Sequence, residues 1–123
     1  MIVMLQGGGD RDLFLKRSRD IEHAKKHGRR ISTALFNMVI CRTDVGDSRV
    51  GIVVGKRFGG AVSRNRVKRL FRELTRQLRG QLLTGHALVV FPKQDSIVEP
   101  FAVLKEAWLS SLQRQRLLRV DED

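Results

Sequence analysis

Apolar residues recur at helical spacing in the middle of the chain. At about 100° per residue, one arc of a helix over residues 62–79 collects Val67, Leu70, Phe71, Leu74 and Leu78. The opposite arc collects the cations Lys68, Arg69, Arg72, Arg76 and Arg79. The pattern predicts an amphipathic helix with one face in a protein core and the other open to anions.

Shorter apolar runs on either side of this helix predict strands. Runs rich in strand-forming residues cover residues 34–42, 49–55 and 87–91. Turn-forming residues occupy 44–47, between the first two runs. We therefore expect the first two strands to pair as an antiparallel hairpin.

Two further helices complete the predicted elements. Ser18 is a candidate N-cap for a helix that runs to about His27, with Gly28 as its left-handed stop. Pro100 suits the first turn of another helix, in which one face is apolar: Phe101, Leu104, Trp108 and Leu112. The predicted order, α-β-β-α-β-α, indicates an α+β fold. It would be a small two-layer sandwich in which helices cover a mostly antiparallel sheet.

The charge of the chain favours a polyanionic partner. Its 123 residues include 24 Lys and Arg against 13 Asp and Glu, a formal net charge of +11. Glu73 is the only acid between Lys56 and Arg79, whereas a merely solvated helix face usually carries both signs. A membrane-surface helix would keep its apolar face free for lipid, but here the neighbouring strands need that face as cover. Phosphate contact is the better prediction.

The remaining composition predicts one cytoplasmic domain. No apolar run approaches the roughly 20 residues of a membrane span, and the apolar residues 1–5 are too few for a signal-peptide core. Cys41, the only cysteine, lies in an apolar run and is predicted to be a small packed hydrophobe rather than a nucleophile. We expect a flexible leader over 1–10, a single α+β domain over 11–118 and an acidic tail over 119–123.

One stretch carries a specific resemblance. Residues 49–57 are RVGIVVGKR, residues 60–62 are GAV, and residues 64–73 are RNRVKRLFRE. This combination resembles the signature of the bacterial ribonuclease P protein subunit. In that family a strand of the form R-[IV]-G-x-x-V-x-K-[KR] leads through a glycine turn to an R-N-R-[IV]-K-R-x-x-R-E helix. The resemblance extends more loosely from about Asp12 to Gln115.

The resemblance implies an accessory subunit of a ribonucleoprotein enzyme that removes the 5′ leader from precursor tRNA. Its partners would be ribonuclease P RNA and precursor tRNA, with no membrane and no obligate protein partner. Catalysis would use Mg²⁺ held mainly by the RNA, so no residue of the protein would be catalytic. The implied RNA contacts lie on the basic helix and just before it: Lys56, Arg57, Arg64, Asn65, Arg66, Lys68, Arg69, Arg72 and Arg76.

The resemblance also implies a cleft, between the first helix and one sheet face, that binds the single-stranded leader. Ile21 and Lys25 stand where the family's first helix often has aromatics. We therefore expect charge from Arg17 and Lys25 to hold the leader, with Phe36 as either a stacking platform on the sheet or a core residue. The family's fold, of the type found in a ribosomal protein's second domain, has a left-handed crossover about the basic helix, against the general rule.

Other chemistry has less support in the sequence. His23 and His27 have the i, i+4 spacing of a metal-binding pair, but no third ligand accompanies them, which favours solvated surface histidines. Four acids in turn or loop segments lack the clustering of a two-metal nuclease site: Asp44, Asp47, Asp95 and Glu99. Two rival classes stay open, a ribosomal or other structural RNA-binding protein with no role in cleavage, and a self-sufficient nuclease.

Overall fold

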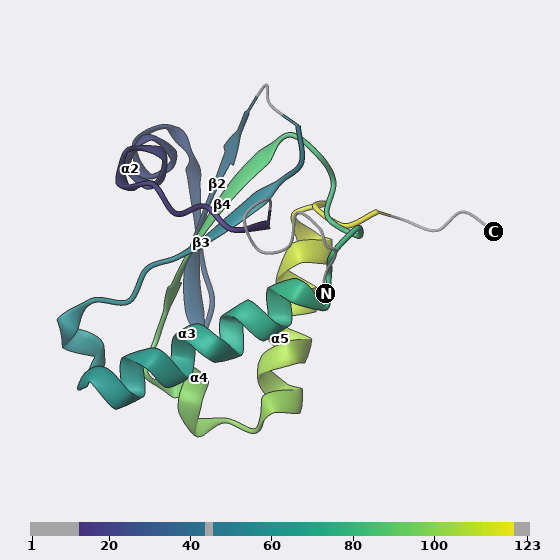
Figure 1. The fold of residues 1–123 in the computed structure, drawn as a ribbon. Coiled ribbons are helices and arrows are strands. Elements are labelled where there is room, and N and C mark those ends of the chain that lie inside the picture. Colours follow the sequence, from purple (N-terminus) through teal and green to yellow (C-terminus); the bar gives the residue numbers. More distant parts are fainter. Residues whose placement is uncertain (1–12, 44–45, 120–123) are drawn as a thin grey trace.

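The computed structural model describes residues 13–43 and 46–119, which form a four-stranded mixed sheet with helices on both faces (Figure 1). The sheet order is β1-β2-β4-β3. The strands are β1 (Arg29–Ser32), β2 (Phe36–Arg42), β3 (Arg49–Ile52) and β4 (His86–Pro92). β2 pairs antiparallel with both β1 and β4, whereas β3 pairs parallel with β4.

Helices cover the two faces of the sheet unequally. α2 (Ser18–His27) lies on one face, and α3 (Ala61–Arg76) and α5 (Phe101–Arg114) lie on the other (Figure 1). Two short helices sit in the connections, η1 (Lys56–Phe58) before α3 and α4 (Asp95–Val98) after β4. The main elements follow the order α-β-β-β-α-β-α, which confirms the predicted α+β class and adds one strand.

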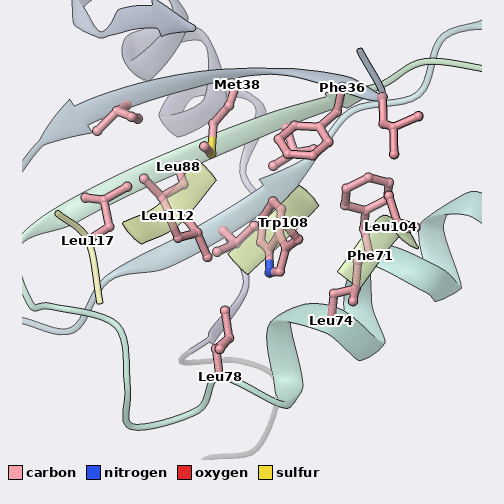
Figure 2. Packing of buried hydrophobic residues seen from close by; sticks show 14 of the residues in the cluster. Phe36, Met38, Phe71, Leu74, Leu78, Leu88, Leu104, Trp108, Leu112 and Leu117 are labelled. Atoms are coloured by element: carbon pink, nitrogen blue, oxygen red, sulfur yellow. The ribbon is translucent and has the colours of Figure 1, made fainter. Parts of the chain in front are cut away.

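The larger core lies between the sheet and the helices α3 and α5 (Figure 2). Phe36 of β2, Phe71 of α3 and Trp108 of α5 are fully buried. Their rings meet edge to face, with centroids 5.8, 5.6 and 5.7 Å apart in the three pairs. Such contacts add about 0.5–1.5 kcal/mol each beyond the burial of the rings. Three elements that are distant in sequence are therefore joined at one point.

α3 turns its apolar arc toward this core, as the sequence predicts. Val67, Phe71 and Leu74 are buried, and the helix ends at Arg76, three residues before the predicted end. Thr75 is buried beside them because its hydroxyl donates to the carbonyl oxygen of Phe71 at 2.7 Å. The burial of these four side chains fixes how α3 is rotated about its own axis.

The predicted hairpin between residues 34–42 and 49–55 is wrong. β4 lies between β2 and β3, and its Val89 is paired with Val39 on one side and Gly51 on the other. The central position suits β4 because Val89 and Val90 are both fully buried, one toward each face of the sheet. The chain instead passes from β3 through α3 to the middle of the sheet.

The hairpin that does form uses β1, which the sequence analysis missed. β1 pairs with β2 from Arg29 opposite Ile40 to Ser32 opposite Asn37. Its residues are mostly exposed and it begins with two arginines, so it contains no apolar run from which a strand could be predicted. Thr33 forms the turn, because its hydroxyl donates to the carbonyl oxygen of Phe36 and accepts from the Phe36 N–H.

The ends of α2 also differ from expectation. Gly28 follows the helix, but its backbone is extended (φ −84°, ψ 164°) rather than left-handed. A glycine is needed at this position for steric reasons, because a Cβ there would lie 2.5 Å from Cγ1 of Val39 and 2.8 Å from the carbonyl oxygen of Ile40. Arg17, not Ser18, occupies the N-cap position, and no side chain caps the helix.

Some sequence-based expectations fall outside the described residues: the flexible leader over 1–10, Asp44, and residues 120–123 of the acidic tail. Cys41 is buried in the smaller cluster beneath α2, as predicted. Across residues 13–43 and 46–119, no helix has the length and apolar character needed to cross a membrane.

The two faces of α3 predict opposite responses to substitution. Leu74→Ala should lower the free energy of unfolding by about 2–5 kcal/mol, because Leu74 is 1% exposed and truncation leaves a cavity. Arg69→Ala, on the solvent side of the same helix, should change it by less than about 0.5 kcal/mol. Urea unfolding of both variants would measure the difference, and equal destabilisation would mean that the helix is oriented otherwise.

Candidate nucleic-acid interface

The turn before α3 holds cations at the end of the sheet. Lys56 and Arg57 are exposed in η1, whose third residue, Phe58, is buried. Gln94, just after β4, anchors the turn because its side-chain amide donates to the carbonyl oxygen of Phe58 at 2.8 Å. Gly59 then turns the chain with φ 152°, a conformation that residues with a Cβ rarely adopt.

α3 itself presents a cationic surface. Five of the predicted contact residues on it are exposed, and two more, Arg64 and Lys68, are partly buried. The first turn contains no acid, and no side chain caps the helix at Gly60. The positive end of the helix dipole therefore adds to the side-chain charge, a combination that favours phosphate. The exposed five are Asn65, Arg66, Arg69, Arg72 and Arg76.

A groove of about 540 Å³ lies beside α3, along the outer edge of β3. Arg72 and Arg76 of α3 supply one wall, and Lys16 adds a third cation from the segment before α2. The guanidinium carbon of Arg76 lies 5.8 Å from the centre of the Phe14 ring. The rest of the lining is apolar: Phe14, Leu15, Ile21, Val50 and Ile52. Cations beside apolar walls suit a chain of alternating phosphates and bases.

The groove brings together residues that the sequence analysis assigned to two separate surfaces. Ile21, predicted for the leader cleft, lines it with Arg72 and Arg76, predicted for the helix surface. Arg17 is exposed at the start of α2. Lys25 lies near the other end of α2, where its ammonium is 3.3 Å from the Glu22 carboxylate. The two predicted surfaces are therefore continuous at Ile21.

Phe36 does not belong to the cleft. It is fully buried on the opposite face of the sheet from α2, with its ring against Phe71 and Trp108. No ring face is left for a base to stack on. The prediction of Phe36 as a stacking platform is therefore corrected, and its alternative assignment as a core residue holds.

Three residues at these surfaces were missed. Lys16 and Phe14 precede α2 and line the groove, and Phe14 forms a parallel bridge with Val50 that extends the sheet edge. Phe91 of β4 is partly exposed on the α2 side of the sheet, 5.9 Å from the Lys25 ammonium. The alternation of β4 could have indicated Phe91, because Ala87, Val89 and Phe91 share one strand face.

The other chemistry considered from the sequence has little geometric support. The rings of His23 and His27 lie against each other, with centroids 4.5 Å apart. His23 also lines a pocket of about 250 Å³ with His86, Asp20 and Asp47. Yet within the described part of the chain, no three His, Cys, Asp or Glu side chains are grouped as metal ligands.

Comparison with known proteins gives a consistent family match. The sequence model of the family described as Ribonuclease P matches residues 10–116. The chain is 32% identical, over 104 residues, to the ribonuclease P protein component of Thermotoga maritima, with 81% of this chain and 89% of that protein covered. It is 27% identical, also over 104 residues, to the ribonuclease P protein component of Alkaliphilus metalliredigens, with 85% and 94% covered.

Solved structures match as well. The RNase P protein from Thermotoga maritima superimposes with a TM-score of 0.74 at 30% identity, covering 82% of this chain and 96% of that one. The RNase P protein from Staphylococcus aureus gives a TM-score of 0.73 at 20% identity, with both chains fully covered. The second likeness concerns the fold alone.

The outward cations of α3 should matter for RNA affinity and not for stability. Arg66→Ala and Arg69→Ala should each weaken RNA binding by about 1–3 kcal/mol, the range for a charged hydrogen bond, with the melting temperature nearly unchanged. Each should also reduce the slope of log affinity against log salt by about 0.7–0.9, the loss of one phosphate contact. Lys105→Ala, an exposed cation on α5, is the matched control. Unchanged affinity in both arginine variants would contradict the assignment.

Proposed function

Because the chain belongs to the ribonuclease P protein family, and is therefore a component of a tRNA-processing ribonuclease, we propose that it binds two RNAs at once. The outward face of α3 binds the catalytic ribonuclease P RNA. The groove beside α3 holds the 5′ leader of precursor tRNA. The observation that carries this proposal is the shared groove, in which Arg72 and Arg76 of α3 face Ile21 and Lys16 at the entry to α2.

The rotation of α3 supports the division between the two RNAs. Arg72 lines the groove, and Arg66 lies about 120° away from it around the helix. Arg69 projects almost opposite the buried arc of Val67, Phe71 and Leu74, two turns before Arg76 on nearly the same side of the helix. Arg66 therefore points away from the groove, and Arg69 lies nearer the start of α3, so both can bind the phosphates of a second, larger RNA. Their guanidinium groups suit such phosphates because they bind two oxygens at once.

The protein contributes electrostatics rather than a catalytic residue in this proposal. Its cations replace counterions that the two RNAs would otherwise gather where they approach each other. The Mg²⁺ ions of the reaction are bound mainly by RNA phosphates, which match the preference of Mg²⁺ for oxygen ligands and retained water. A lone, buried cysteine at position 41 fits a reducing compartment, and we place the complex in the cytoplasm.

A three-part cleavage assay tests the proposal. We expect the protein alone to leave precursor tRNA intact, and a bacterial ribonuclease P RNA alone to cleave it slowly at low Mg²⁺. The two together should cleave it faster, and this gain should shrink as Mg²⁺ is raised, because added cations take over the same screening. Cleavage by protein from which RNA has been rigorously removed would indicate a nuclease. No stimulation at any Mg²⁺ concentration would favour a structural RNA-binding protein.

Substitutions on the two sides of α3 should separate the two RNAs. Arg72→Ala should weaken holoenzyme binding of precursor tRNA by about 1–3 kcal/mol and leave binding of leaderless tRNA nearly unchanged, since Arg72 faces the groove. Arg66→Ala, about 120° away around the helix, should instead weaken assembly with the catalytic RNA. Filter binding with substrates of both kinds would measure the contrast. Equal losses for precursor and leaderless tRNA in Arg72→Ala would count against a leader in the groove.

A further inference from the structure

A small pocket lies between α3 and α5, on the flank of α3 that is turned away from the groove. Its volume is about 210 Å³, and Leu74 and Trp108 form part of its lining. Around the α3 helix, Leu74 lies about 160° from both Arg72 and Arg76, which line the groove. The pocket is therefore separate from the groove, and none of the cations assigned to RNA lines it.

The pocket contains a buried hydrogen-bond donor. Trp108 is completely buried, and within the described residues its indole Nε1 has no hydrogen-bond partner. Figure 2 shows the indole nitrogen on the side of the ring that is turned away from Phe36, toward Leu74 and Leu78. Both leucines line the pocket together with Trp108. Because an unpaired buried N–H is unfavourable, this donor favours an acceptor placed in the pocket.

The packing of the core fixes the direction in which this donor points. The Trp108 ring meets the rings of Phe36 and Phe71 edge to face, at centroid distances of 5.6 and 5.7 Å. Leu104 and Leu112, one helical turn away on either side along α5, are also fully buried. The indole therefore has no room to turn its N–H toward another partner.

The edge of the pocket carries neutral polar side chains. Gln77 and Gln81 are exposed there, and Lys105 is the only charged residue among the described residues of the lining. The Gln77 amide donates to the Glu73 carboxylate at 3.4 Å, which leaves the side-chain oxygen of Gln77 as an acceptor. The pocket thus combines a buried donor with amide oxygens at its edge.

We propose that this pocket binds a small neutral molecule that carries a carboxamide group on an apolar ring. The carbonyl oxygen of the ligand accepts from the Trp108 N–H. Its NH₂ group donates to the side-chain oxygen of Gln77 or Gln81, and its ring packs against the leucines of the lining. The volume suits such a molecule, because a cavity of about 150 Å³ holds one benzene ring.

A neutral ligand fits better than an anion because of where the charges lie. Lys105 is exposed at the edge of the pocket, whereas the indole N–H is buried. A carboxylate that reached Trp108 would lose its hydration without gaining a buried counterion. An amide carbonyl is easier to desolvate, and the same group supplies the hydrogens that the glutamine oxygens accept.

The single tryptophan of the chain makes the site directly observable. Its indole N–H gives one signal in a proton–nitrogen correlation spectrum of the full chain. Benzamide should move this signal downfield until it saturates, with a Kd on the order of 1 mM for a ligand of this size. Toluene, which has no acceptor, should cause no downfield shift, and benzoate should bind more weakly than benzamide.

Variants test the assigned contacts. Gln81→Ala should weaken benzamide binding about 2- to 12-fold, the loss of one neutral hydrogen bond. Gln113→Ala, which removes an exposed glutamine elsewhere on α5, should leave the affinity unchanged. Trp108→Phe keeps an aromatic ring and removes the donor, so its affinity, read from the backbone signals of Leu78 and Leu109, should fall at least as far. Thermal unfolding checks that each variant is folded, and exposed Gln81 tests the site without changing the core.

Three results would overturn the proposal. An indole signal that stays in place at the highest soluble benzamide concentration would mean that no acceptor reaches the donor. An equal downfield shift with toluene would mean that the shift does not report a hydrogen bond. Tighter binding of benzoate than of benzamide would make this a site for anions. The proposed RNA surfaces of α3 would stand in each case, because the pocket shares no cation with them.

Discussion

The edge-to-face packing of Phe36, Phe71 and Trp108 is the contact on which the rest of the structure depends (Figure 2). It joins the sheet to α3 and α5 at one point of the main core. Since α3 has a single apolar arc, burying Phe71 determines where every cation on that helix points. Arg72, the next residue, is turned by about 100° and lines the groove. Loss of the Phe71 ring would lower the free energy of unfolding by about 3–5 kcal/mol. The cations of α3 would still be present, but they would point in other directions.

The central position of β4 connects the separate parts of the interface. Its end leads to Gln94, which anchors the cationic turn before α3. Its parallel neighbour β3 is left at the sheet edge, where Val50 and Ile52 form a wall of the groove. Had β3 paired with β2 as a hairpin, that edge would have been interior and the groove would have had no wall there. The parallel crossover through α3 therefore creates the groove that α3 also lines.

Local periodicity predicted the local features and little beyond them. The repeat of apolar residues located α3 and gave its buried and cationic faces, because both follow from geometry within one helix. Strand pairing depends on residues far away, so adjacency in sequence suggested a hairpin that the sheet does not contain. β1 escaped notice because an exposed edge strand needs no apolar run. The role of Phe36 stayed open because the alternation of side chains along β2 assigns them to two faces but does not indicate which face α5 covers.

The central claim is that one rigid domain presents the outward face of α3 to the catalytic RNA and the groove between α3 and the start of α2 to the leader. Site-directed hydroxyl-radical cleavage tests it most directly, with the radical source on a cysteine at Glu73→Cys on α3 or Ser18→Cys at the start of α2, in a Cys41→Ala background. Both positions are exposed, and Ser18 lies between Lys16 and Ile21, which line the groove. The account predicts strongest cleavage of the catalytic RNA from position 73 and of the precursor leader from position 18, in the same holoenzyme. Strongest leader cleavage from position 73, or the same cleavage pattern from both, would contradict it.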